Sequence, residues 1–271
     1  MDNGNFLLAY WHDQTDILLK AAARSGNDFS LDEMHDLRVA IKKLRSVLQF
    51  KKALLSEPYG ASLIPNTELF FRLLGQCRAL DLSSKLLQDT VEQRETPFHE
   101  LASLLQVARN LAAGAISGDL SRLVHPEVIQ AEKNLRLDLS PLEGRELAAR
   151  SEKLLRKKFR RIREKLPGLA RRPHIARKDL KTFYYWLKLC PQGLLLSEES
   201  ITQLEKLLDL LGDWHDSQVL QAQAGHLGAV LFSRGTPAFD RHRGLARWLE
   251  KSNARQIRSA VKLANRWKKT W

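Results

Sequence analysis

The spacing of apolar residues along the chain predicts helices. After residue 30, Leu37, Ile41, Leu44 and Leu48 recur every three or four residues, which places them on one helical face. Two later stripes have the same period: Leu155, Phe159, Ile162 and Leu166, and then Ala176, Leu180, Phe183 and Leu187. The sequence shows no sustained alternation typical of a strand. The pattern therefore predicts an all-α fold.

Capping residues and helix breakers divide the chain. Helices are predicted at about 5–24, 30–55, 66–93, 97–115, 145–166, 173–190, 198–227 and 239–268. Ser30 or Asp32 is the expected cap of the second helix, with Glu33 at the capping-box spacing from Ser30. Residues 117–144 contain two glycines and two prolines and are predicted to be a linker with one short helix, 127–137.

A short basic motif occurs twice. The first copy reads His35-Asp-Leu-Arg38-Val-Ala-Ile-Lys42-Lys43-Leu-Arg45, and the second reads His174-Ile-Ala-Arg177-Lys178-Asp-Leu-Lys181-Thr-Phe-Tyr184. Both follow His-x2-Arg-x3-Lys-x2-(Arg or Tyr), and on a helix these offsets place the side chains in one narrow arc. Each copy predicts a helix that carries a row of positive charge, headed by histidine, beside its buried stripe.

A second motif is repeated at nearly the same distance. It reads Leu73-Leu74-Gly75-Gln76-Cys77-Arg78 and later Leu210-Leu211-Gly212-Asp213-Trp214-His215. His35 and His174 are 139 residues apart, and Gly75 and Gly212 are 137 residues apart. Two different motifs with almost one offset, far longer than the period of solenoid repeats, indicate an internally duplicated helical bundle.

Together the two motifs resemble the CHAD domain (conserved histidine α-helical domain) over about residues 5–267. The resemblance implies one domain, 1–270, made of repeat 1 (5–116), a linker (117–144) and repeat 2 (145–268). It implies two four-helix bundles related by a pseudo-twofold axis around a basic central channel that binds inorganic polyphosphate without catalysis. The copies differ in two places, because Ala79 stands where the second copy has Asp216, and Tyr184 aligns with Arg45.

The charge distribution favours a polyanionic partner. The chain has a net charge of +13, and the excess is concentrated in residues 151–188 (14 basic, 3 acidic) and 241–271 (10 basic, 1 acidic). A third basic row is formed by Lys153, Arg156, Arg160 and Arg163, which follow one another at helical spacing. Cations that converge in this number repel one another unless an anion is bound.

We therefore expect two arms of a polyphosphate site. The first arm is His35, Arg38, Lys42, Lys43, Arg45 and Arg78; the second is His174, Arg177, Lys178, Lys181 and His215 with Lys153, Arg156, Arg160 and Arg163. Arginine can bind two phosphate oxygens at once, whereas lysine acts as a mobile point charge. A lone histidine or charge run is more often structural, and the repetition is what favours function here. Protonation of the histidines predicts mildly tighter binding below pH 7.

Two other functions stay open. A nucleic-acid-binding protein would use the same charge but would interleave exposed aromatic residues, of which the basic rows contain few. The pair His215-Asp216 suggests a metal-dependent phosphohydrolase, yet His99, His125, His226 and His242 show no paired spacing with carboxylates. Phosphate-loop and nucleophile-elbow motifs are absent from the sequence. We expect no catalytic residues, metal or cofactor.

The remaining sequence features predict a soluble protein of the cytoplasm. Cys77 and Cys190 lie within helical patterns and are expected to be reduced thiols. The N-terminal residues lack the pattern of a signal peptide, and no apolar run approaches the roughly 20 residues that span a bilayer. Trp186, Trp214 and Trp248 are expected to pack in the bundles. The polyphosphate interpretation adds association with polyphosphate granules, and the sequence leaves the oligomeric state open.

Overall fold

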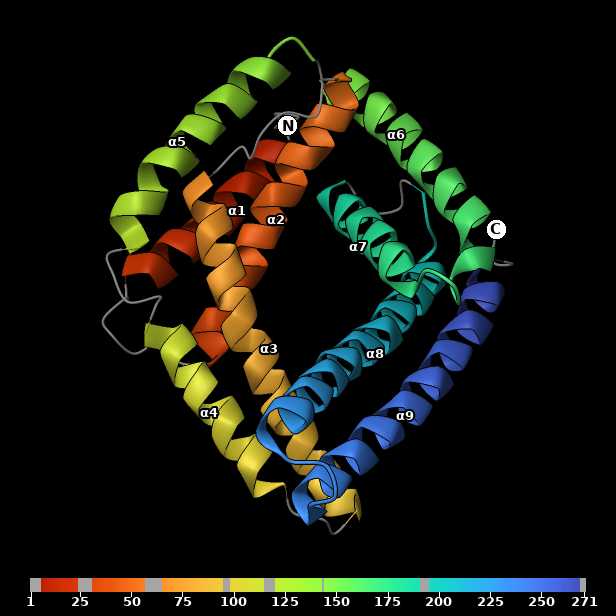
Figure 1. The fold of residues 1–271 in the computed structure, drawn as a ribbon. Helices are drawn as coiled ribbons and strands as arrows, with labels where there is room; N and C mark the ends of the chain where they lie inside the picture. Colours follow the sequence, from red (N-terminus) through yellow and green to blue (C-terminus); the bar gives the residue numbers. More distant parts are fainter. Residues whose placement is uncertain are drawn as a thin grey trace. The chain divides into compact units, whose positions relative to one another are not determined.

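The structure is a computed structural model that describes residues 6–23, 31–56, 65–94, 98–114, 120–142, 144–190 and 195–268. All regular secondary structure in these ranges is helical (Figure 1). In chain order the helices are α1 (Phe6–Ala23), α2 (Leu31–Leu55), α3 (Pro65–Arg94), α4 (His99–Gly114), α5 (Leu120–Leu139), α6 (Gly144–Lys165), the 3-10 helix η1 (Leu166–Gly168), α7 (Pro173–Leu189), α8 (Glu198–Leu231) and α9 (Pro237–Trp267). The all-α prediction is confirmed.

Most predicted boundaries agree with these helices, and the predicted linker is the main difference. Instead of a short helix at 127–137, the chain forms α5 over Leu120–Leu139 with Pro126 inside it. Proline removes one backbone donor, and Pro126 on its own therefore predicts a break in the helix. Packing outweighs that loss, since Val128, Leu135 and Leu139 are buried and α5 packs against α1. The predicted cap Ser30 lies outside the described residues.

The chain divides into two compact units. Unit 1 comprises residues 1–75, 113–164 and 179–198, and unit 2 comprises 76–112, 165–178 and 199–271. Each unit thus contains segments from both predicted repeats, whose boundaries stay a prediction. Two of the unit boundaries fall well inside a helix: α3 passes from unit 1 to unit 2 after Gly75, and α7 passes from unit 2 to unit 1 after Lys178.

Unit 1 is built on the apolar stripe of α2. Leu37, Ile41, Leu44 and Leu48 are all buried, as predicted, and α1 packs against α2. Aromatic contacts connect α7 to its neighbours: the ring centroids of Phe50 and Trp186 are 5.4 Å apart, and those of Phe159 and Phe183 are also 5.4 Å apart. Ion pairs also join helices in this unit, among them Lys51–Asp138 at 2.6 Å and Lys158–Asp179 at 2.7 Å. Some of the unit's basic residues therefore have structural partners.

Unit 2 has its own apolar core, to which α3, α4, α8 and α9 contribute. Its members are Leu87, Phe98, Leu101, Leu105, Leu220, Ala224, Leu245 and Leu249. Trp248 packs against this cluster, and Trp267 donates a hydrogen bond from Nε1 to the backbone oxygen of Ser200 at 3.0 Å. Thr236 caps α9 by accepting a hydrogen bond from the Phe239 amide at 3.3 Å. The expected packing role of Trp186, Trp214 and Trp248 is confirmed, because the first two are buried and the third contacts the core.

Candidate functional site

Three cations of α2 gather around one aromatic ring of α3 in unit 1. The guanidinium carbons of Arg38 and Arg45 each lie 4.9 Å from the centroid of Phe71, and Lys42 Nζ lies 5.9 Å from it. The three cations are half-buried and come from successive turns of one helical face. We call Arg38, Lys42, Arg45 and Phe71 the Phe71 cluster.

The cluster depends on a close approach at Gly75. Gly75 follows Phe71 by one helical turn, so both lie on the same face of α3. A Cβ atom at residue 75 would be 3.0 Å from Arg38 Nη1, which is closer than ordinary van der Waals contact. Glycine therefore leaves the space that the Arg38 guanidinium occupies beside α3.

Contacts that join α2 to α3 stabilise the charges of the Phe71 cluster. The negative face of the Phe71 ring attracts all three cations. Glu68 adds one carboxylate, whose Oε1 lies 3.0 Å from Arg45 Nη2. Three positive charges around one ring still repel one another, and a bound anion would reduce that repulsion.

The other residues of the first copy lie beside the Phe71 cluster. His35 is exposed and precedes Arg38 by one turn on the same face of α2. Lys43 is half-buried and points about 100° around the helix from Lys42, because each residue of an α-helix turns by that angle. Arg78 lies on the part of α3 that belongs to unit 2 and is also half-buried. His35 extends the row, whereas Lys43 leaves it.

The second copy forms a cluster of rings in unit 2. The centroids of His174 and Trp214 are 4.6 Å apart, and those of His174 and His215 are 5.2 Å apart with the rings nearly perpendicular. His174 is exposed, His215 is half-buried and Trp214 is buried, so the indole supports two imidazoles at the surface of the unit. We call His174, Trp214 and His215 the His174 cluster.

Basic residues continue along α7 from this cluster. Arg177 is half-buried and Lys178 is exposed, and both belong to unit 2. Lys181, also half-buried, lies in the part of α7 that belongs to unit 1. Gly212 differs from its counterpart Gly75, because a Cβ atom there would meet nothing within 4 Å. In the second copy, the described contact with the repeated motif is that of His174 with Trp214 and His215.

The predicted basic row of α6 faces away from the buried side of that helix. Leu155, Phe159 and Ile162 are buried, whereas Lys153, Arg156 and Arg160 are exposed on the opposite face, with Arg163 half-buried at its edge. Arg156 is paired with Glu152 at 2.6 Å. The cation of α6 that contacts α7 is instead Lys158, which lies 5.9 Å above Trp186. The part of the α6 row in ligand binding stays a prediction.

Sequence reasoning missed Phe71. Few aromatic residues lie within the basic rows, but this ring comes from another helix and reaches the cations across the interface of α2 and α3. The available signal was its position, four residues before Gly75 and therefore on the same helical face.

Both cysteines are free and buried. Burial raises the pKa of the Cys190 thiol to about 12, and burial together with Asp81 raises the pKa of Cys77. In the ranges that the structure describes, no three His, Cys, Asp or Glu side chains are grouped so that they could hold a metal ion. None of the described helices is long and apolar enough to cross a membrane.

Comparisons with known proteins agree with this architecture. The family model of the CHAD domain matches residues 9–225. The crystal structure of the CHAD domain from the plant Ricinus communis is similar in fold, with a TM-score of 0.65 and 18% sequence identity over 95% of this chain and 90% of that chain. No curated protein matches the sequence significantly. The family model covers most of the chain, including both copies of each motif, and the chain belongs to the CHAD domain family.

Proposed function

We propose that this protein binds inorganic polyphosphate and does not convert it chemically. The observation that carries the proposal is the gathering of Arg38, Lys42 and Arg45 around Phe71, because three adjacent cations favour a ligand with several closely spaced negative charges. CHAD domains are associated with polyphosphate binding in general, which supports the same ligand class. A cytoplasmic location, with granules as a ligand store, belongs to this proposal.

Each motif copy supplies one arm of the proposed site. Arg38 and Arg177 occupy the same position in the two copies, and arginine binds phosphate oxygens in pairs. A linear polyphosphate carries roughly one charge per unit, so binding releases condensed counterions, and affinity falls with log salt by about 0.7 for each phosphate neutralised, as for single-stranded nucleic acid. The internal duplication and the central basic channel that the sequence predicts are part of the proposal.

The Phe71 ring favours phosphate over nucleic-acid bases as the ligand. Stacking platforms for single strands offer an open aromatic face to each base. Here three cations lie within 6 Å of the Phe71 centroid and compete for that face. The cluster therefore offers a ligand positive charge and not an open aromatic face, and the ring keeps the three cations close together.

The test is a competition between long-chain polyphosphate and single-stranded DNA of equal charge at about 0.15 M salt, where screening reduces weak surface attraction. We expect strong preference for polyphosphate. Arg38→Ala combined with Arg177→Ala should weaken binding by about 100-fold or more, since each charge-assisted bond contributes roughly 1.5–3 kcal/mol. Incubation with polyphosphate should release no orthophosphate.

A matched control variant loses the same amount of positive charge as the Arg38/Arg177 variant, but at positions outside the clusters. Arg145 and Arg234 are exposed and lie outside both clusters, so Arg145→Ala with Arg234→Ala should alter affinity only slightly. Circular dichroism should show both double variants folded. Equal binding of the two ligands, or unchanged affinity in the Arg38/Arg177 variant, would contradict the proposal.

A further inference from the structure

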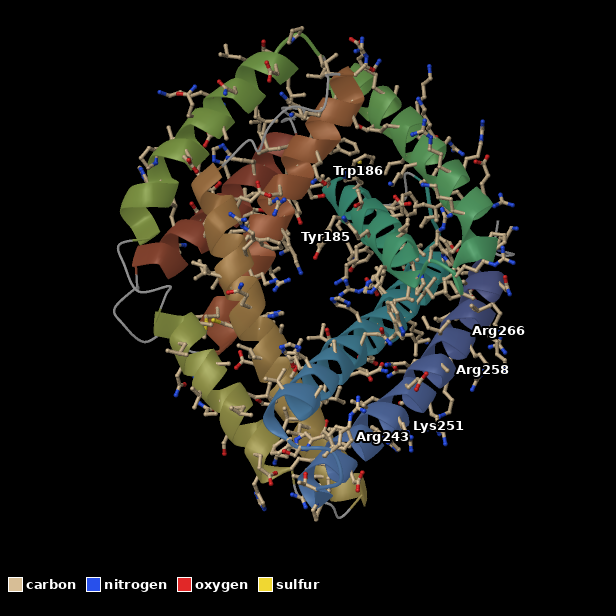
Figure 2. The ribbon with its side chains drawn as sticks, in the orientation of Figure 1. Tyr185, Trp186, Arg243, Lys251, Arg258 and Arg266 are labelled. Carbon is tan, nitrogen blue, oxygen red and sulfur yellow. The ribbon has the colours of Figure 1, made fainter. Side chains whose placement is uncertain are left out.

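A long row of exposed basic residues follows one face of α9. Its members recur every three or four residues: Arg243, Arg247, Lys251, Arg255, Arg258, Lys262 and Arg266. Figure 2 shows four of them, Arg243, Lys251, Arg258 and Arg266, along one side of the helix. We call these seven residues the α9 row. The matched part of the family model ends at residue 225, so the row lies outside it.

The α9 row is a solvent-facing surface of considerable length. All seven side chains are exposed, and the opposite face of α9 buries Leu245, Leu249, Ala260 and Ala264 in unit 2. At about 1.5 Å per residue, the distance from the first to the last of them is about 35 Å. The seven cations therefore form an extended, nearly continuous band of positive charge on a rigid support.

The composition of this face identifies the chemistry that it fits. The exposed positions of α9 that are not basic are Pro237, Asp240, Glu250, Ala254, Ser259 and Asn265. No large apolar or aromatic side chain is exposed on α9, whereas membrane-inserting helices need apolar residues and base-stacking surfaces need aromatic ones. Five of the seven cations are arginines, which suit bidentate contact with phosphate oxygens. The face fits a flexible chain of phosphates.

Basic residues also connect the α9 row with the His174 cluster inside unit 2. The 3-10 helix η1 packs against α9. Immediately after η1, the amides of Arg171 and Arg172 donate hydrogen bonds to the Gly168 oxygen at 3.0 and 3.1 Å, and both side chains are exposed. His174 follows two residues later. Positive charge thus continues from the His174 cluster to the element that contacts α9.

We propose that the α9 row is an extension of the polyphosphate site that only long chains reach, so that the protein selects its ligand by chain length. The inference rests on the proposed function. A chain held at the His174 cluster brings its remaining phosphates to α9 at high effective concentration, and each further contact adds affinity without a new binding event. A short chain binds at the clusters of the proposed site and does not reach the α9 row.

The experiment compares two chain lengths in wild type and in a charge-neutralised variant. The number of phosphate units in the short polyphosphate does not exceed the number of cations in the His174 cluster and next to it. The long polyphosphate has enough additional units to cover the α9 row as well. The variant combines Lys251→Ser, Arg255→Ser and Arg258→Ser, which are exposed positions in the middle of the row. For the long chain we expect affinity to fall on the order of tenfold and the salt dependence to become shallower by about 2. Short-chain affinity should not change.

The control removes the same charge elsewhere. Lys20, Lys85 and Lys133 are exposed on α1, α3 and α5, and Lys20→Ser with Lys85→Ser and Lys133→Ser should leave the preference for long chains intact. If the α9 variant binds long chains as tightly as wild type, or loses short-chain affinity equally, the inference is wrong while the proposed function stands. If wild type binds neither chain, the proposed function itself fails. A loss confined to long single-stranded DNA would overturn the inference in favour of nucleic acid.

Discussion

The Phe71 cluster and the His174 cluster come from the same repeated motifs and differ in which side chains pack against the aromatic ring. In the first, arginine and lysine side chains lie over a half-buried phenylalanine beside Gly75. In the second, an imidazole packs on a buried tryptophan. A Cβ atom added at Gly212 would have no neighbour within 4 Å. The two copies therefore keep one spacing and use it for different contacts.

The position of the aromatic residue explains the difference. Phe71 precedes its glycine by four residues, and the corresponding residue before Gly212 is Leu208, which is buried. Trp214 follows its glycine by two residues, where the first copy has Cys77. Moving the ring along α3 or α8 changes which residue of the facing helix it meets. One cluster is thus built from arginine and lysine side chains, and the other contains two imidazoles.

The largest expected effect separates the two rings by their contribution to stability. Trp214 is 5% exposed, so Trp214→Ala should lower the free energy of unfolding by about 3–5 kcal/mol. Phe71→Ala should cost about 1–2 kcal/mol, because that ring is only partly buried and loses mainly cation contacts. Urea denaturation measures both values, and equal losses would show that Phe71 is also a core residue.

An intermediate effect compares the two glycines. Gly75→Ala should displace the Arg38 guanidinium and weaken polyphosphate binding by about tenfold, which is part of one charge-assisted bond. In Gly212→Ala the added methyl group enters open space, so affinity for polyphosphate should stay unchanged. The helix should gain up to about 1 kcal/mol of stability, because alanine favours a helix more than glycine does. Isothermal titration with the two variants side by side provides the measurement. Similar losses of affinity in both variants would show that the difference between the two glycines does not affect ligand binding.

The smallest expected effect is the response to pH. A protonated imidazole binds a polyanion more tightly than a neutral one, so affinity should rise a few-fold from pH 8 to pH 6. His174→Gln combined with His215→Gln should remove most of this rise, and His35→Gln should remove less, because only the second copy brings two imidazoles together. A flat titration in wild type would contradict the assignment of charge to the His174 cluster.

Periodicity predicted the helices and their buried faces well, because burial of an apolar stripe is a local consequence of helix geometry. Leu37, Ile41 and Leu44 are buried as their spacing requires. The length of α5 was missed, because the local cost of Pro126 is visible in the sequence and the packing on α1 is not.

The residues of the candidate site were predictable only within one helix. The row of Arg38, Lys42 and Arg45 follows from spacing alone, but the ring that gathers them lies on α3 and becomes visible only when the two helices are packed. Spacing also grouped Lys153, Arg156 and Arg160 correctly, yet a shared face does not reveal what that face meets. Contacts between helices depend on their packing, which periodicity does not encode.

The passage of α3 and α7 through both units has a consequence for how this chain can vary. The chain leaves unit 1 after Gly75, inside α3, and returns to it at Ala113. It leaves unit 1 again after Glu164 and returns at Asp179, inside α7. Neither unit is a contiguous stretch of sequence, so no single break in the chain releases one of them whole. Recombination or truncation that would exchange one unit alone must also cut α3 and α7, each of which carries one copy of a repeated motif.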